Sequence, residues 1–475
     1  MRPFGFQFMS PLLIGTLLNP INAAMIATAL VPIGRDLRVG PGSTAWLIAS
    51  LYLAAAIGQP LMGRIAELYG PRKVSSAGLV LVAIAGFGGA LAPGLGWLIV
   101  ARAVLGLGTS AAYPAAMTMI RDRAEETGIG VPGNVLGLIS ITSQASAVVG
   151  PALGGLLVGL TGWRSIFLVN IPLALGGLVL GWLWLPRDRP REASRRRAGY
   201  RIGREIDIVG VVLFGAAMTT LLVFLMRLRP HPPYVLSAAA VLLFGALAWW
   251  ELRRHNPFLD VRMLAHDRGL TLTYVRYALH WLVIYCVIFG VTQWLEEGRG
   301  LSPEATGLVT LPMAAVAGIA AAVASPRAGV RGPMLIGTVA MIVGTFALTA
   351  LHATSPIALL VLVTVVLGLP QGIGSVTNQA ALYRQAPADR MGSASGLLRT
   401  SQYFGAIVQS SIIGAVFGAR ADDAALHDLA PILGVLSIVL LLITAADRNL
   451  RALPAPTYPP TPLPSSRHAF PVAPS

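Results

Sequence analysis

Long apolar segments recur along almost the whole chain, and they constrain its fold more than any other feature. Only 12% of the 475 residues are charged, against roughly 25% in soluble domains, so the charges cannot cover a water-facing surface and the solvent must be lipid. Because a helix needs about 20 apolar residues to cross the hydrocarbon core, windows of that length predict fourteen membrane-spanning helices. Their ranges are 11–33, 43–62, 75–93, 97–119, 134–160, 165–185, 207–228, 234–252, 270–294, 304–325, 333–352, 356–380, 392–418 and 429–447.

The segments between these spans are short. The longest internal one, 187–206, is rich in arginine and is expected to lie near anionic lipid headgroups, whereas 453–475 is rich in Pro and Ser and predicts a disordered tail. Such lengths leave no room for a folded extramembrane domain, which excludes an ATP-driven pump and most membrane enzymes. No phosphate-binding G-x-x-x-x-G-K-[ST] loop occurs, and the single cysteine, Cys286, allows no internal disulfide. We therefore expect a protein that is not an enzyme and holds no cofactor or metal.

Positive charge is distributed unequally between the two sides of the predicted bundle. An even number of spans places both termini on one side, and that side carries 25 of the 35 Lys and Arg residues, against 7 on the other side and Arg102, Arg276 and Arg399 within spans. Because Lys and Arg concentrate in cytoplasmic loops, both termini are predicted to be cytoplasmic in a multi-pass protein of the cell (inner or plasma) membrane. The net charge of +15 then reports orientation, and we expect no nucleic-acid partner.

The turn between the second and third spans carries the sequence G-R-I-A-E-L-Y-G-P-R-K at 63–73. This pattern resembles the G-x-L-a-D-r-x-G-r-k signature of the major facilitator superfamily, with Glu instead of the usual Asp. Glycines allow helices to approach closely, and the resemblance implies a latch that holds the two halves of the protein together in one conformation. An ordinary basic cytoplasmic loop is the alternative. The motif positions are Gly63, Glu67, Gly70, Arg72 and Lys73.

Two further runs point to a narrower group within that superfamily. The fifth span contains G-P-A-L-G-G at 150–155, which resembles the G-P-x-x-G-G motif of antiporters, and its motif positions are Gly150, Pro151, Gly154 and Gly155. Proline removes a backbone hydrogen bond and glycine eases close packing, so this helix is predicted to be pliable and tightly packed. The following run at 162–172, G-W-R-S-I-F-L-V-N-I-P, is similar to one found in the fourteen-span drug:proton antiporters.

The resemblance covers nearly the whole chain and implies an all-α polytopic membrane protein of the major-facilitator type. It predicts two six-helix halves, 1–186 and 269–452, with 187–268 supplying the linker and two extra central helices. The implied function is secondary active transport by alternating access, exporting small amphipathic drugs or metabolites in exchange for protons. The alternatives are a facilitative or uptake permease and a non-transporting scaffold or sensor with the same fold. We expect a monomer whose partners are a small-molecule substrate, protons and membrane lipids.

The chain departs from the antiporter pattern in its buried charges. Asn22 stands where these antiporters typically have an Asp, and none of the 20 acidic residues falls at the centre of a predicted span. Ionisable residues within membranes are functional by default, so Arg399 and His280 predict a cavity that prefers anionic or neutral solutes. His280 is the candidate carrier of the coupling proton. For each Asn or Gln, and for Arg102, an interhelical hydrogen bond is the alternative.

The superfamily resemblance implies that spans 1, 2, 4, 5, 9, 10, 12 and 13 line the cavity. The residues predicted to form the substrate and proton pathway are Asn22, Arg102, Tyr113, Gln144, His280, Gln371, Asn378, Arg399, Gln402 and Tyr403, with Asn19, Gln59 and Tyr277 as further polar candidates.

Overall fold

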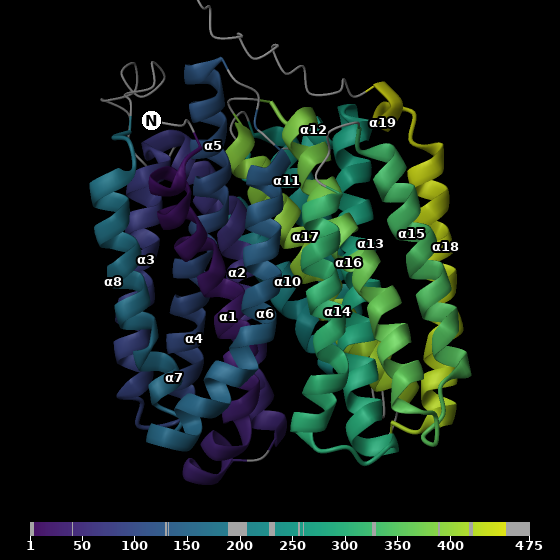
Figure 1. The fold of residues 1–475 in the computed structure, drawn as a ribbon. Helices are drawn as coiled ribbons and strands as arrows, with labels where there is room; N and C mark the ends of the chain where they lie inside the picture. The colour runs from purple at the N-terminus through teal and green to yellow at the C-terminus, as the bar shows by residue number, and fades with distance from the viewer. Residues whose placement is uncertain are drawn as a thin grey trace, which may run out of the picture.

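The computed structural model describes residues 4–39, 41–128, 131, 133–188, 207–227, 233–254, 257–259, 261–324, 329–387, 390–417 and 421–452. Every regular element in these ranges is a helix (Figure 1). The first group comprises α1 (Phe6–Asp36), α2 (Pro41–Tyr69), α3 (Pro71–Ala90), α4 (Leu95–Ser110), α5 (Ala112–Thr127), α6 (Gly133–Thr161), α7 (Ser165–Leu168) and α8 (Asn170–Trp184). The remainder are α10 (Ile208–Met226), α11 (Tyr234–Arg253), α12 (Val261–His266), α13 (Arg268–Gln293), η2 (Trp294–Gly298), α14 (Pro303–Val323), α15 (Arg331–Ala347), η3 (Leu348–Ala350), α16 (Ile357–Gln385), α17 (Met391–Phe417), α18 (Asp423–Ala446) and α19 (Asn449–Ala452).

Twelve helical stretches within the described ranges are long and apolar enough to cross a membrane, and each overlaps one of the predicted spans. The two other predicted spans, 134–160 and 392–418, coincide with α6 and α17, helices of 29 and 27 residues. The count of fourteen spans stays a prediction. Large apolar side chains such as Val323 and Leu160, which are 80% and 73% exposed, cover the outside of the bundle, as a lipid environment requires.

The predicted fourth span is divided between two helices. α4 ends at Ser110, and α5 begins at Ala112. Pro114 has no N–H group, so it cannot donate to the carbonyl of Ser110 and the helical hydrogen-bond ladder is interrupted there. The two helices still form one continuous apolar stretch, Leu95–Thr127.

Helices within each predicted half pack mainly against one another. In the first half α1 packs against α6, α2 against α4, and α3 against α4 and α8; in the second half α14 packs against α16, α13 against α17, and α15 against α16 and α18. Contacts between the halves join α2 and α5 to α17, and α6 to α14 and α16.

The two extra helices, α10 and α11, form an antiparallel pair beside these halves. Phe214, Met218 and Leu222 of α10 share an apolar cluster with Ala55 of α2 and Ile407 of α17. α10 therefore covers the seam between α2 and α17, and α11 packs against α10.

Figure 1 places the beginning of α1 and the short helix α19 at the same end of the bundle. We call this end, where α2 and α18 also finish, the terminal face. The other end, where α1 finishes and α2 and α18 begin, is the opposite face.

Candidate functional site

A cavity of about 850 Å³ lies between the two halves of the bundle. Its lining comes from α1, α2, α4 with α5, α6, α13, α14, α16 and α17, which are the eight spans expected to line it. The lining runs from Gln59 and Arg399 in the middle of the bundle to Glu296 and Thr306 near the opposite face. We call this space the central cavity.

Arg399 is the only basic residue among the described residues that line the central cavity. Its guanidinium carbon lies 4.0 Å from the centre of the Tyr113 ring, and Nη1 donates a hydrogen bond of 2.8 Å to Oε1 of Gln402. Within the described ranges it forms no ion pair with an acidic side chain. An aromatic face and an amide dipole stabilise the cation only partly, so the cavity presents a net positive charge at this level.

A layer of hydrogen bonds between the halves closes the central cavity toward the terminal face. The Tyr113 hydroxyl donates to Oε1 of Gln379 at 3.2 Å, and Nε2 of Gln379 donates to the Ser140 hydroxyl at 2.9 Å. A further bond between the halves lies within the lining, farther from the terminal face than Thr16 and Arg399: the Tyr403 hydroxyl donates to Oδ1 of Asn19 at 2.7 Å. These bonds join α5 and α6 to α16, and α1 to α17.

Closer to the terminal face, Glu67 of α2 holds the first turn of α17. Its carboxylate accepts hydrogen bonds from the backbone N–H of Ser393 at 2.6 Å and from the Ser393 hydroxyl at 3.0 Å, and Arg64 Nη1 lies 3.3 Å away. A carboxylate at a helix N-terminus is favoured by the helix dipole. One turn away, a Cβ on Gly63 would overlap the carbonyl group of Gly392. Backbone contact and a charged cap therefore tie α2 to α17.

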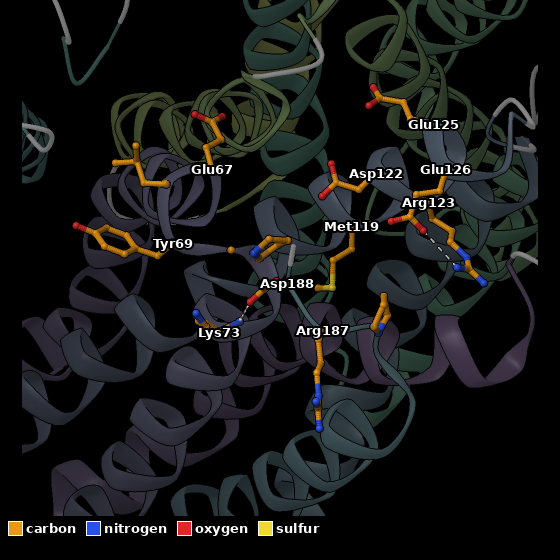
Figure 2. Close-up of a pocket in the computed structure, with 14 residues that line it drawn as sticks. Glu67, Tyr69, Lys73, Met119, Asp122, Arg123, Glu125, Glu126, Arg187 and Asp188 are labelled. Carbon is orange, nitrogen blue, oxygen red and sulfur yellow. Dashed lines mark hydrogen bonds and ion pairs between the residues drawn. The ribbon is translucent and has the colours of Figure 1, made fainter. Parts of the chain in front are cut away.

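The remaining motif residues of this turn act within the first half. Gly70 has φ of +102°, a conformation that favours glycine, and it is the N-cap residue that precedes α3. The Asp188 carboxylate accepts from the backbone N–H groups of Arg72 and Lys73 at 2.9 and 3.0 Å, and Arg72 Nη2 donates to the carbonyl of Trp182. Figure 2 shows Asp188 facing Lys73 at one side of a cavity of about 520 Å³. This arrangement anchors the start of α3 to the end of α8.

The antiporter-like motif on α6 forms a close crossing with α1. A Cβ on Gly150 would overlap that of Ala24, and one on Gly154 would lie 2.6 Å from the Thr28 hydroxyl. Gly155 has open space around it. The side chain of Pro151 lies outside the described part of the structure.

Comparison with known proteins agrees with this architecture. Residues 12–410 match the family model described as Major Facilitator Superfamily. The chain belongs to this superfamily. It is 33% identical over 435 residues to the uncharacterized MFS-type transporter YwoD of Bacillus subtilis, covering 91% of this chain and 94% of that protein. The multidrug resistance protein Stp of Mycobacterium tuberculosis is 28% identical over 409 residues, covering 84% of this chain and 73% of that protein.

The solved structure of the proton:xylose symporter XylE aligns with this chain with a TM-score of 0.62. The sequence identity is 16%, and the alignment covers 93% of this chain and 95% of that one. This likeness shows the major-facilitator fold alone. The protein is therefore an all-helical, membrane-embedded transporter of the major facilitator superfamily.

In this superfamily member, Asn22 and Arg102 lie outside the described lining of the central cavity. The amide groups of Asn22 and Asn170 exchange two hydrogen bonds of 2.5 and 3.0 Å. Arg102 donates from Nε to the carbonyl of Leu47 at 2.9 Å and from Nη1 to that of Asn22 at 3.3 Å. Both residues join helices within the first half. For Arg102, this is the interhelical hydrogen bonding that was the alternative to a pathway role.

His280 and Asn378 lie beside the central cavity, in the interior of the second half. They line a space of about 10 Å³ together with Arg276. Nη1 of Arg276 lies 2.5 Å from Oδ2 of Asp447, and both side chains are almost fully buried. No acidic partner for Arg276 is evident from the sequence, and the structure supplies one from the end of α18.

Most of the other predicted pathway residues line the central cavity, and the structure adds several more. The predicted residues in the lining are Asn19, Gln59, Tyr113, Gln371, Arg399, Gln402 and Tyr403. The side chain of Gln144 lies outside the described part of the structure. Sequence reasoning missed Tyr285, Trp281 and Ser375, which line the cavity, and Gln379, which helps to close it. Trp281 carried a signal, because it is mid-span whereas the other tryptophans are near span ends.

Proposed function

We propose that this superfamily member is a secondary active exporter of small amphipathic molecules. The observation that carries the proposal is a large cavity between the halves that is closed toward the terminal face while its lining reaches the opposite face. Access from one side at a time is what alternating access requires. The name of the relative Stp, a multidrug resistance protein, supports export over uptake.

The terminal face is proposed to be cytoplasmic, in the cell membrane, because the sequence places most positive charges there. The conformation described here is then the outward-facing one. Its opening toward the cytoplasm requires α17 to separate from α2, which breaks the bonds between Glu67 and Ser393. We assign these bonds, together with the Gly63–Gly392 contact, the role of the conformational latch.

Proton influx is proposed as the energy source. One charge moving across the membrane gains about 2.3 kcal/mol per 100 mV. His280 is the proposed proton carrier, since it is buried and no hydrogen-bond partner of its Nε2 is found among the described residues. The neighbouring Arg276–Asp447 pair would respond to a charge on His280. We further propose that the protein works as a monomeric carrier without catalysis.

Purified protein in proteoliposomes with an imposed pH gradient tests this proposal. The expected result is proton flux that appears when a compound from an amphipathic panel is added, and this flux shows antiport. Substrate flux that is independent of the gradient would instead identify a facilitative permease. Absence of flux with every compound would contradict transport and leave a scaffold or sensor.

A further inference from the structure

Building on the proposed transport function, we infer that the site takes an anionic amphipathic molecule. Its negative group binds at Arg399, and its apolar chain extends into a second cavity beside α14. The inference rests on three features of the site: an uncompensated cation, hydrogen-bond donors beside it, and a continuous apolar arm.

The first feature is the charge of Arg399. A guanidinium has five N–H donors, and the partners of this one among the described residues are Oε1 of Gln402 and the hydroxyl of Tyr113, neither of which carries a negative charge. The side chain is partly exposed to the cavity. A cation held away from bulk water without a counter-ion is unfavourable. A carboxylate, sulfate or phosphate group would supply that counter-ion and form short charge-assisted hydrogen bonds.

The second feature is the polar surroundings of this cation. Gln402 donates from Nε2 to the Tyr285 hydroxyl at 2.9 Å, so the hydroxyl hydrogen of Tyr285 is available to a ligand. The only acidic residue in the described lining, Glu296, lies eleven residues farther along the same helical segment. At 1.5 Å per residue this is an axial separation of about 16 Å. A ligand at Arg399 is therefore well separated from the one competing negative charge.

The third feature is the apolar arm. A second cavity of about 710 Å³ lies between α6, α13, α14 and α16. Apart from a few hydroxyl groups and Gln371, its side chains are apolar, including Leu156, Val287, Met313 and Leu367. It shares with the central cavity the residues Thr28, Ile288, Thr292, Gly307, Thr310 and Gln371.

The arm begins close to the charged end of the site. Ile288, which lines both cavities, is three residues from Tyr285 on α13, an axial distance of about 5 Å. A molecule with one negative end and one apolar chain can therefore place both in matching surroundings, with the chain passing the uncharged residues that the two cavities share. A lipophilic cation would bring its charge to Arg399.

Direct binding to the full-length protein in phosphatidylcholine nanodiscs tests the inference without any gradient. Octanoate and dodecanoate serve as anionic ligands, with octyl- and dodecyltrimethylammonium as cations of matched length, and quenching of tryptophan fluorescence reports binding. We expect dodecanoate to bind at least about tenfold more tightly than dodecyltrimethylammonium. Arg399→Gln is expected to remove this preference, and Arg399→Lys to retain part of it. Equal affinities in the wild type, or an unchanged preference in Arg399→Gln, overturn the inference.

The apolar arm is tested by chain length. Gly307 lines both cavities and has open space around its Cα, so Gly307→Leu fills the junction. This variant is expected to bind dodecanoate no better than octanoate. Gly318→Leu, on the same helix, also in open space and absent from both linings, is the control and should keep the chain-length preference. An unchanged chain-length preference in a folded Gly307→Leu protein overturns the placement of the ligand's apolar chain in the second cavity.

Two further experiments distinguish this inference from a lipid-binding site and from the proposed transport function. If phosphatidylglycerol in the nanodiscs abolishes dodecanoate binding, the occupant is a lipid headgroup and the substrate assignment is overturned. Anion-selective binding by a protein that transports nothing in proteoliposomes contradicts the proposed function and leaves the ligand assignment intact. Transport without a preference for anions contradicts the ligand assignment and leaves the proposed function intact.

Discussion

Glu67 on α2 and Ser393 on α17 are 326 residues apart in the chain, and their two hydrogen bonds of 2.6 and 3.0 Å join the two halves at the terminal face. The carboxylate is buried at the first turn of α17. Its loss removes both bonds and the favourable contact with the helix dipole. This pair is therefore the most direct test of the proposed latch.

Glu67→Ala is expected to shift the protein toward the conformation that is open at the terminal face. Hydrogen bonds to charged groups contribute about 1.5–3 kcal/mol, which corresponds to a population shift of about tenfold or more. Alkylation of single cysteines measures it, in a Cys286→Ala background. Ala116 is buried on the terminal-face side of Tyr113, and a cysteine at this position should react faster. A cysteine at Thr310, which lines the central cavity, should react more slowly.

The control for this shift is Glu126→Ala. Glu126 pairs with Arg123 three residues earlier on the same helix, so it does not join the halves through that bond. Both cysteines should keep their wild-type alkylation rates in this variant. Unchanged rates in Glu67→Ala as well would remove the latch from the mechanism.

Gly63→Ala is expected to weaken the same closure by a steric route. The added methyl group would overlap the Gly392 carbonyl, so α2 and α17 must move apart. We expect a lower melting temperature and the same change in alkylation as in Glu67→Ala. Gly159→Ala on α6, where a methyl group meets open space, is the matched control. A Gly63→Ala protein with wild-type stability and alkylation would contradict the close crossing.

The Arg276–Asp447 pair is expected to be strongly coupled. Removing one member of a buried ion pair leaves an uncompensated charge and costs about 3–5 kcal/mol. Arg276→Met and Asp447→Leu should therefore each lower the free energy of unfolding in detergent. The double variant should recover most of the loss, because it buries no unpaired charge. Additive losses in this double-mutant cycle would show that the pair does not interact as described.

His280→Gln is expected to abolish transport driven by a pH gradient while substrate exchange without a gradient persists. Glutamine retains a polar side chain but cannot carry the proton at physiological pH. His427→Gln, near the opposite face, serves as the control because its ring bonds the carbonyl of Leu351 outside the central cavity. Wild-type gradient-driven uptake in His280→Gln proteoliposomes would sink the proposed proton carrier.

At the opposite face, Asp36 gives a pH-dependent tie between α1 and the turn before α7. Hydrogen bonds from the Trp163 indole at 3.0 Å and from Arg164 at 3.1 Å lower the pKa of the Asp36 carboxyl. A lowered pKa stabilises the folded protein above the pKa of the unfolded chain, about 4, and this contribution disappears as pH falls through the folded-state pKa. Asp36→Asn should therefore lower the melting temperature at neutral pH by a small amount.

The difference between wild type and Asp36→Asn should vanish in acid. Melting curves recorded at neutral pH and well below pH 4 provide the measurement. The effect stays small because the ion pair is about half exposed and solvent screens it. A difference that is equal at both pH values would assign the role of Asp36 to something other than its charge.

The helical framework was predictable because each span solves its main physical problem alone. In lipid, a helix satisfies its own backbone hydrogen bonds, so a run of about 20 apolar residues is sufficient to specify it. Short motifs were predictable for a related reason: Gly63 and Gly150 mark close crossings because only glycine lacks the Cβ that would collide.

The orientation of polar side chains depended on the tertiary structure. Asn19 and Asn22 are three residues apart on α1, about 60° apart around the helix, yet Asn19 lines the central cavity and Asn22 bonds to Asn170 inside the first half. No local pattern distinguishes the two, because the rotation of α1 is fixed by helices that contact it.

The sequence by itself determined the membrane environment, the superfamily and the glycine-mediated crossings. Only the tertiary structure decided which buried charges are compensated. Arg276 is neutralised by Asp447, 171 residues away, whereas Arg399 faces the cavity without an acidic partner among the described residues. Coulomb interactions depend on the distance between charges in space and not on their separation along the chain, so the buried arginines form a site only when the helices are assembled.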